Sequence, residues 1–302
     1  MKSLLIIGGT GFLGKSFIDS FLKKKLKGVS KIFILSRKYK KNKKNIYYLK
    51  GDISKINQIP ICNYTIFAAE QAETRNYRLS NKKNIINFCN IIKTIKYKGK
   101  ILYISSGAYY GISKFNKIKF KENTKIANIK KCKYKKYTIQ KRFSEKKIKA
   151  LSTLGYKVSI ARCFSFIGKY LPKNKGYFIS DLIVSIKNKK KVIINSKINI
   201  IRSYMYSDDM VIWLMKMLKN TNNSCSIYNV GSDKKISIFK LAEFICKKYR
   251  LPLEKFNKTS LVKFNSYVPN INKAKKLLNL KIKYNINDSI KKILEHDKNR
   301  VN

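Results

Sequence analysis

The chain alternates between short apolar runs and segments in which apolar residues recur every three or four positions. The runs predict buried parallel strands, and the longer period predicts helices that cover them. Strands are expected at residues 4–7, 31–35, 46–49, 64–69, 100–111 (opening into a loop) and 157–162. Helices are expected at residues 12–22, 80–95, 137–151, 178–186, 210–218 and 238–249. This alternation predicts an α/β fold with a doubly wound parallel sheet and a smaller C-terminal region.

A glycine-dense turn joins the first expected strand to the first expected helix. Gly8, Gly11 and Gly14 have the spacing G-x-x-G-x-x-G, and Phe12 and Leu13 stand at the start of the helix. Glycines allow a tight turn, a close approach of backbone amides to a pyrophosphate, and close packing of helix on strand. The helix N-terminus adds unpaired N–H groups and a partial positive charge. The pattern therefore favours a dinucleotide site in a Rossmann-like fold over a tight turn without a ligand.

The chain carries a large excess of positive charge. Lys and Arg total 69 against 15 Asp and Glu, which gives a formal net charge of +54 over 302 residues. Lysine supplies nearly all of it, whereas base and phosphate recognition enriches arginine, whose planar fork binds in bidentate fashion. Lysine is abundant together with Ile, Asn and Tyr, as expected of AT-rich coding bias. We therefore expect no specific nucleic-acid partner, only weak and salt-dependent attraction of polyanions.

The cysteines and the single histidine limit the chemistry. The six cysteines are scattered without a C-x-x-C pair, which is typical of buried thiols in a reducing compartment. His296 is the only histidine, which excludes histidine-based triads and His-ligated metal sites. Acid–base work therefore falls to Tyr, Lys, Asp, Glu or Cys. Gly8 interrupts the first apolar run and no later segment is long enough to span a membrane, so we expect a cytoplasmic protein with no membrane partner.

Two later segments carry candidate catalytic residues. The fifth expected strand ends in S-S-G-A-Y-Y-G from Ser105, and Tyr137 and Lys141 follow as Y-x-x-x-K at the start of a helix. Tyr137 and Lys141 are one turn apart and share a helix face. A free phenol has a pKa of about 10, and a neighbouring ammonium stabilises the phenolate, so Lys141 can prepare Tyr137 to act as a base. Y-x-x-x-K alone is unspecific in a chain rich in Tyr and Lys, and its weight comes from its order after the other two motifs.

The three motifs, taken in order, resemble the extended short-chain dehydrogenase/reductase family, in particular the NAD-dependent epimerase/dehydratase type. The resemblance covers nearly the whole chain and implies three catalytic residues: Ser106, Tyr137 and Lys141, the last also bonded to the nicotinamide ribose. It implies further cofactor contacts at a G-D-I motif and at two small residues that end the fourth strand. These are Asp52, Ile53, Ala68 and Ala69. Asp52 alternatively caps a turn.

The end of the second expected strand bears on the type of dinucleotide. An acid at this place binds the ribose 2′-hydroxyl, whereas a small polar residue and an arginine accommodate a 2′-phosphate. Ser36 and Arg37 stand here, and no acid does. The sequence therefore favours NADP over NAD, with Arg37 as an ordinary surface cation as the alternative.

The resemblance places substrate contacts in the second half of the chain. Ser165 stands where the family commonly has an asparagine that contacts the sugar-nucleotide pyrophosphate. Arg202 begins a segment similar to R-D-Y-x-H-V-x-D, whose arginine pairs with substrate phosphate. Arg162 is expected to help shape the same pocket, and Asp209 to hold the start of the following helix. Together they imply a nucleotide-diphosphate sugar as substrate.

Gly107 and Ala108 argue against one activity of similar proteins. Sugar 4,6-dehydratases need an acid–base pair, typically Asp-Glu, directly after the catalytic Ser/Thr, and neither Gly nor Ala can move a proton. We therefore expect a nucleotide-sugar epimerase that acts through a transient keto-sugar. An NADPH-dependent reductase of a nucleotide-linked 4-keto-sugar is the alternative, and a dinucleotide-binding regulatory protein is the non-enzymatic one.

The expected domain organisation has two parts. Residues 1–165 form the dinucleotide-binding domain, and residues 166–302 mainly a substrate-binding region from which part of 203–230 returns to the first domain. Residues 193–194 and 198–201 are expected to form a strand pair. The resemblance implies a homodimer formed through the helices at 80–95 and 137–151.

Overall fold

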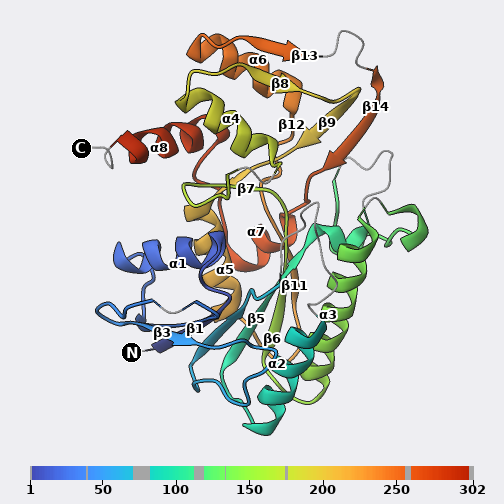
Figure 1. Ribbon diagram of the computed structural model, residues 1–302. Helices are drawn as coiled ribbons and strands as arrows, with labels where there is room; N and C mark the ends of the chain where they lie inside the picture. Colours follow the sequence, from blue (N-terminus) through green and yellow to red (C-terminus); the bar gives the residue numbers. More distant parts are fainter. Residues whose placement is uncertain are drawn as a thin grey trace.

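A seven-stranded parallel sheet forms the centre of the computed structural model, which describes residues 2–38, 40–70, 82–111, 119–132, 134–173, 176–255 and 260–298. The strand order is β11-β6-β5-β4-β1-β2-β3, and every neighbouring pair is parallel. The strands are β1 (Lys2–Ile7), β2 (Val29–Ser36), β3 (Ile46–Lys50), β4 (Tyr64–Phe67), β5 (Lys100–Ser106), β6 (Val158–Cys163) and β11 (Ile227–Val230). The predicted doubly wound α/β fold is confirmed (Figure 1).

Helices cover both faces of this sheet, which explains why its central strands are apolar throughout. One face carries α1 (Phe12–Leu22), α5 (Ser207–Lys219) and α7 (Asn272–Leu278), whose apolar residues join one core cluster with the sheet. The other face carries α2 (Lys82–Thr94) and α3 (Lys135–Thr153), which form a second core cluster. Figure 1 shows the two layers on opposite sides of β1, β5 and β6. The helix expected at 80–95 is found from Lys82, and its first two residues lie outside the described residues.

The C-terminal region has its own apolar core between helices and small sheets. Its helices are α4 (Phe178–Lys187), α6 (Ile238–Tyr249) and α8 (Ile286–Lys298). One sheet joins β9 (Ile198–Arg202) to β12 (Ile236–Ser237) and β14 (Ser260–Tyr267), and another joins β8 (Val192–Ile194) to β13 (Leu253–Lys255). Short β7 (Phe166–Ile167) and β10 (Met205–Tyr206) pair with each other. The expected strand pair at 193–194 and 198–201 is therefore wrong, because each of these strands pairs with later segments of the chain.

Strand β11 and helix α5 belong to the layers of the central sheet although they follow the first C-terminal elements in sequence. β11 pairs with β6 at the edge of the sheet, and α5 packs beside α1. The division at residue 165 itself stays a prediction. None of the described helices is long and apolar enough to cross a membrane.

Two side chains at helix starts bond to distant segments of the chain, one of them Asp209. Asp209 does not hold the first residue of α5, which begins at Ser207; its carboxylate accepts hydrogen bonds from the backbone N–H of Lys283 and Tyr284 at 3.1 and 3.0 Å. Asp209 therefore anchors the chain that leads into α8. Ser237 precedes α6, yet its hydroxyl donates to Asn199 on β9 rather than to the helix. Each side chain bonds to a distant segment.

Candidate active site

The predicted site residues converge at the carboxyl ends of the parallel strands, where open α/β sheets bind ligands. The sheet reverses its winding between β1 and β4, so the loop after β1 and the chain after β4 border the crevice at this switch point. Gly8 follows β1 with a φ of +88°, and a Cβ there would lie 2.7 Å from the carbonyl oxygen of Ala68. A Cβ at Gly14 would lie 2.1 Å from the carbonyl oxygen of Gly9. Both positions therefore require glycine for close backbone packing.

The N-terminus of α1 points into the loop and fits a pyrophosphate. Gly11 is the N-cap without a side-chain hydrogen bond, and no acidic residue stands in the first turn, which begins with Phe12 and Leu13. No acidic side chain of this first turn neutralises the helix dipole, so the free N–H groups at the helix start suit an anion. Ala68 and Ala69 directly follow the neighbouring β4, and the carbonyl oxygen of Ala68 lies against Gly8.

The remaining cofactor candidates lie at the ends of β2 and β3. The Ser36 hydroxyl donates to the Lys38 carbonyl at 2.9 Å, and Arg37 is exposed beside it. Asp52 accepts from the backbone N–H and the hydroxyl of Ser54 at 2.9 and 2.8 Å, and these bonds lower the pKa of its carboxyl. Ile53 is buried. The turn expected as the alternative role of Asp52 is therefore present, and its side chain is already bonded within it.

Tyr137 and Lys141 lie on one face of α3, directed at the carboxyl end of the sheet. The Lys141 ammonium lies 5.5 Å from the centroid of the Tyr137 ring. Its Nζ also donates to the carbonyl oxygen of Ile104 on β5, at 3.1 Å. The helix start and β5 together place the ammonium beside the phenol, as the spacing of the motif predicts.

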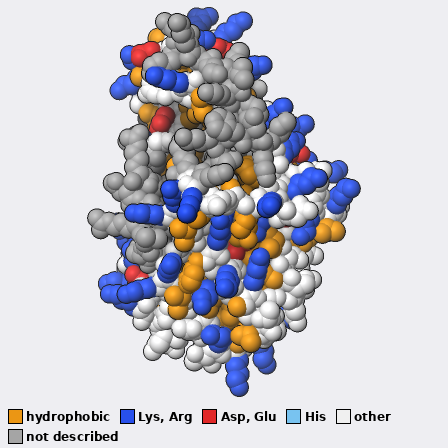
Figure 2. Space-filling model, turned by 90° about the vertical axis from the view of Figure 1, so that its right-hand side faces the viewer, with side chains coloured by type: hydrophobic (Ala, Val, Ile, Leu, Met, Phe, Trp, Pro, Cys, Tyr) orange, Lys and Arg blue, Asp and Glu red, His pale blue; other side chains and the backbone are white. Residues whose placement is uncertain are grey.

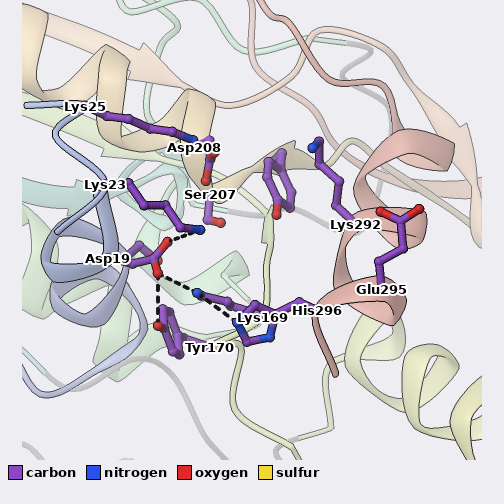
Figure 3. A pocket seen from close by; sticks show the side chains of 12 residues that line it. Asp19, Lys23, Lys25, Lys169, Tyr170, Ser207, Asp208, Lys292, Glu295 and His296 are labelled. Carbon is purple, nitrogen blue, oxygen red and sulfur yellow. Dashed lines mark hydrogen bonds and ion pairs between the residues drawn. The ribbon is translucent and has the colours of Figure 1, made fainter. Parts of the chain in front are cut away.

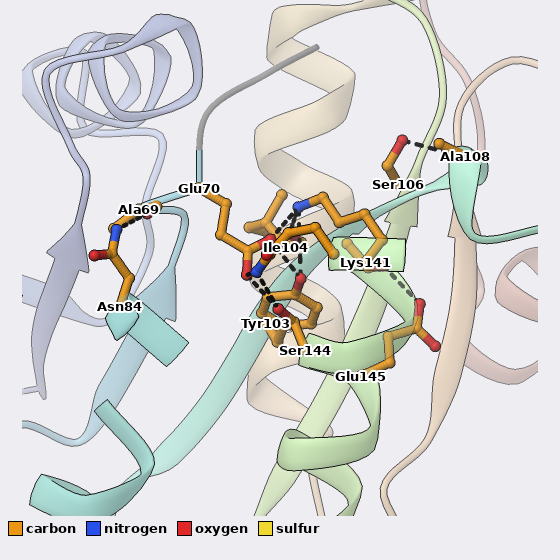
Figure 4. A network of polar contacts seen from close by, with 12 residues as sticks. Ala69, Glu70, Asn84, Tyr103, Ile104, Ser106, Ala108, Lys141, Ser144 and Glu145 are labelled. Carbon is orange, nitrogen blue, oxygen red and sulfur yellow. Dashed lines mark hydrogen bonds and ion pairs between the residues drawn. The ribbon is translucent and has the colours of Figure 1, made fainter. Parts of the chain in front are cut away.

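A buried carboxylate, Glu70, completes this cluster and was not anticipated from the sequence (Figure 4). Lys141 donates to Oε2 of Glu70 at 2.6 Å, and both side chains are almost fully buried. The Tyr103 hydroxyl donates to the same oxygen at 2.7 Å, and the Ser144 hydroxyl donates to Oε1 at 2.5 Å. Glu70 follows Ala69 directly, so the one sequence signal was an acid placed at the carboxyl end of an apolar strand.

Ser106 lies at the end of β5 and meets a second unanticipated residue, Tyr267. Its Oγ accepts from the backbone N–H of Ala108 at 3.2 Å and lies 3.3 Å from the Tyr267 hydroxyl. Burial raises the pKa of Tyr267 well above the usual range of a phenol, and the Tyr137 phenol also acts on it electrostatically. The Tyr267 hydroxyl therefore links the neighbourhoods of Ser106 and Tyr137.

Arg202 is a half-buried cation at the end of β9 for which the described residues offer no carboxylate. Its Nη1 donates to the backbone carbonyls of Ile201 and Asn265, at 2.8 and 3.1 Å. Burial lowers the pKa of Arg202, against the electrostatic pull of Tyr204, Tyr134 and Tyr267. A half-buried guanidinium without a carboxylate among the described residues suits an anionic ligand. The backbone carbonyl of Ser165 accepts from Met205 N–H, and this places Ser165 beside the segment that follows Arg202.

Arg162 does not belong to an open substrate pocket, and that expectation is wrong. Its Nε and Nη2 donate to both carboxylate oxygens of Glu145 at 2.8–3.2 Å, and Nη1 donates to the Glu122 carbonyl at 3.0 Å. The guanidinium carbon lies 3.7 Å from the Tyr109 ring centroid. Its donor groups are directed at the protein, so Arg162 supports the core below the site.

A separate pocket of about 200 Å³ lies where α1, α5 and α8 meet. Figure 3 shows Lys169 between Asp19 and His296, with Nζ 2.5 Å from the carboxylate and 3.1 Å from the ring nitrogen. Asp19 pairs with Lys23 and Lys169 in the pocket wall, and Asp208 pairs with Lys25. None of the described residues form a group of three or more His, Cys, Asp or Glu side chains that could hold a metal ion.

The comparison with known families decides the class of this protein. The model of the NAD dependent epimerase/dehydratase family matches residues 4–231. The chain belongs to this family. The resemblance drawn from the three motifs is therefore confirmed, and with it the expectation of an enzyme that depends on a nicotinamide dinucleotide and is related to nucleotide-sugar epimerases and dehydratases. The loop, the dipole of α1 and the small residues after β4 fit such a cofactor.

A curated relative and several solved structures are similar to this chain. The bifunctional polymyxin resistance protein ArnA of Wigglesworthia glossinidia brevipalpis is 25% identical over 340 residues, covering 97% of this chain. The chain spans about half, 51%, of that relative's length. A dTDP-glucose 4,6-dehydratase from Bacillus anthracis, in complex with NAD, has a TM-score of 0.79 at 18% identity, covering 99% of this chain and 98% of its own. A UDP-N-acetylglucosamine 4-epimerase from Bacillus cereus has a TM-score of 0.76 at 18% identity, covering 99% and 97%.

Proposed function

We propose that this protein is a nucleotide-sugar epimerase that acts through a transient keto-sugar. The observation that carries the proposal is the cluster of Tyr137, Lys141 and Ser106 at the carboxyl edge of the sheet, beside the glycine loop. Family membership supports an enzyme rather than a regulatory dinucleotide-binding protein. A bound nicotinamide ring supplies a reversible hydride acceptor.

Each residue of the cluster has a role in this reaction. Tyr137 takes the proton of the sugar hydroxyl, directly or through Ser106, and returns a proton after the keto-sugar has turned over in the pocket. Ser106 orients the reacting oxygen through its hydroxyl. Lys141 stabilises the phenolate of Tyr137 and holds the nicotinamide ribose. Ser106 and Tyr267 share a hydrogen bond, so Tyr267 orients the Ser106 hydroxyl.

The surroundings of Gly107 support an activity without elimination of water. A Cβ at Gly107 would lie 2.7 Å from both the Tyr267 hydroxyl and the Phe164 ring. An acidic side chain at this position would collide with both, and Ala108 has no proton to give. The reductase of a 4-keto-sugar uses the same residues in one direction, so it remains the alternative to be separated by experiment.

We propose a nucleotide-diphosphate sugar as substrate, with Arg202 and Ser165 at the diphosphate. Arg202 is half-buried and has two carbonyl contacts but no carboxylate among the described residues. A structurally similar protein, MoeE5, binds UDP-glucuronic acid and NAD at 14% identity and a TM-score of 0.78, covering 99% of each chain. An anionic diphosphate would compensate the guanidinium of Arg202.

We propose that NADP is preferred to NAD. The exposed Arg37 directly follows β2, whose last residue is the small Ser36, and no acid stands at this strand end. Similar solved structures contain NAD. Binding measurements that compare NADP with NAD therefore test this proposal.

We propose a homodimer that forms through α2 and α3. Figure 2 shows the face to the right of Figure 1, where hydrophobic side chains lie between lysines over these helices. Ile86 on α2 and Ile139 on α3 are exposed at 38% and 40%. Light scattering on the wild type and an Ile139→Lys variant tests this: a dimer that becomes a monomer in the variant supports it, and a monomeric wild type refutes it.

Incubation with a panel of nucleotide sugars, with and without added NADPH, tests the reaction when it is followed by NMR. A product isomeric with its substrate, without net consumption of the cofactor, supports the epimerase. Stoichiometric loss of NADPH on a keto-sugar would replace the epimerase by the reductase. A Tyr137→Phe variant with unchanged turnover would refute the catalytic role of Tyr137 in either case.

A further inference from the structure

The buried carboxylate of Glu70 has no place in the reaction as described so far. Its side chain is 2% exposed, and Lys141 and Tyr103 donate to one oxygen while Ser144 donates to the other. Gln140 adds a longer hydrogen bond of 3.4 Å to that second oxygen. Glu70 therefore links the chain after β4 with β5 and α3, directly under the candidate catalytic pair.

Lys141 needs such a partner because it is buried. Burial lowers the pKa of Lys141, and the charge of Glu70 outweighs this effect, so that the pKa lies above that of a free lysine. The other titratable groups that face the ammonium are the phenols of Tyr103 and Tyr137 and the thiol of Cys163, whose pKa burial raises to about 12. Among the described residues, Glu70 is the one carboxylate within ion-pair distance of Lys141.

We propose that Glu70 is a positioning residue that keeps Lys141 in its ammonium form and aims the ammonium at Tyr137 and the nicotinamide ribose. The inference rests on the role proposed above for Lys141. Without Glu70, the buried amine would release its proton, and Tyr137 would lose the charge that stabilises its phenolate. No atom of Glu70 takes part in the chemistry itself.

The hydrogen bonds of Lys141 orient its ammonium group. Its three protons have acceptors at 2.6 Å in Glu70, 3.1 Å in the Ile104 carbonyl and 3.5 Å in the Tyr103 hydroxyl. The two shorter bonds fix Nζ from two sides. The third, at the limit of a hydrogen bond, is the one that a ribose hydroxyl can replace.

The first test is the pH dependence of thermal unfolding of the cofactor-free protein. In Glu70→Gln the folded state holds a neutral Lys141 with a lowered pKa, whereas the unfolded chain binds the proton up to a pH of about 10.4. The unfolded state then binds more protons, so the stability of the variant rises with pH, while that of the wild type gains nothing from Lys141. We expect the gap in Tm to the wild type to narrow by about 5 °C from pH 6.5 to 9.5.

Glu145→Gln is the matched control, because it removes a buried carboxylate from an arginine that cannot lose its proton. Its gap in Tm to the wild type should stay constant over the same pH range. A gap for Glu70→Gln that is equally constant would overturn the proposal. If Glu70→Gln does not fold at either pH, Glu70→Ala replaces it, because it also removes the carboxylate: a gap that narrows with pH supports the proposal, and a constant gap refutes it.

The second test is the pH profile of turnover. Glu70→Gln should move the acid limb of kcat to higher pH by about one unit or more, and Glu70→Asp should restore much of the wild-type profile. Glu145→Gln should leave the limb in place. The two proposals fail in different ways. Full turnover in Tyr137→Phe would refute the proposed catalytic role of Tyr137. A Tm gap between Glu70→Gln and the wild type that does not change with pH, measured without cofactor, would refute the role of Glu70 alone.

Discussion

Two buried ion pairs lie side by side on helix α3, and we assign one a role in catalysis and the other a structural role. Lys141 and Glu145 are four residues apart: Lys141 pairs with Glu70, in the chain after β4, and Glu145 pairs with Arg162 on β6. All four side chains are at most 4% exposed. Burial and pairing by themselves therefore do not tell a structural pair from a functional one.

The surroundings of the two cations make the difference. The Arg162 guanidinium is held in bidentate fashion by Glu145, bonded to a backbone carbonyl and stacked on Tyr109, so its donors are directed at the protein. The Lys141 ammonium has one contact at the limit of hydrogen bonding and faces the phenol of Tyr137. Lys141 can therefore exchange its weakest hydrogen bond for one to a ligand while its charge acts on the Tyr137 phenol, whereas Arg162 cannot. Four predictions test this contrast and the other proposed roles of cations, from the largest expected effect to the smallest.

The first prediction compares the tyrosine beside each cation. Tyr137→Phe should lower kcat by about 10³-fold, because it removes the proposed acid–base group. Tyr109→Phe keeps the ring over Arg162 and should leave kcat within about twofold. Steady-state kinetics on the preferred nucleotide sugar measures both. Equal losses in the two variants would remove the distinction between the pairs.

The second prediction removes each cation. Lys141→Met should lower kcat/KM by about 10²-fold or more and leave Glu70 buried without its partner, at a cost of about 3–5 kcal/mol in the free energy of unfolding. Arg162→Met leaves Glu145 unpaired and should cost a similar free energy of unfolding, with kcat of the folded protein changed only a few-fold. Urea unfolding and kinetics at low temperature separate the two effects. A large loss of kcat in folded Arg162→Met contradicts a purely structural role of Arg162.

The third prediction concerns Arg202, a half-buried cation that meets no carboxylate among the described residues. Arg202→Ala should raise KM for the nucleotide sugar about 10- to 100-fold, because charge-assisted hydrogen bonds to the diphosphate are lost. Its free energy of unfolding should not fall by the 3–5 kcal/mol expected for either ion pair, since no anion is left unpaired. An unchanged KM would place the diphosphate elsewhere.

The fourth prediction concerns the exposed Arg37. Arg37→Ala should weaken the binding of NADP about 10-fold and leave that of NAD unchanged, since only NADP carries the 2′-phosphate. Calorimetric titration of both dinucleotides into wild type and variant measures the difference. Equal changes for the two, or tighter binding of NAD by the wild type, would contradict the preference for NADP.

Much of the architecture follows from local patterns in the sequence. The apolar run before Gly8, the glycine spacing and the helical period after it predict β1, the loop and α1, because each depends on neighbouring residues. The spacing of Tyr137 and Lys141 likewise predicts their shared face, since four residues make about one helical turn. The order of these motifs was sufficient to indicate the family.

Contacts between distant parts of the chain were decided by the tertiary structure alone. Glu70 and Lys141 are 71 residues apart and Ser106 and Tyr267 are 161 apart, and no local period relates such positions. Arg162 could not be separated from a substrate-binding arginine until the fold placed Glu145 against it. The sequence determines which side chains stand at strand ends and helix faces, but the partner that each one meets depends on how the layers pack.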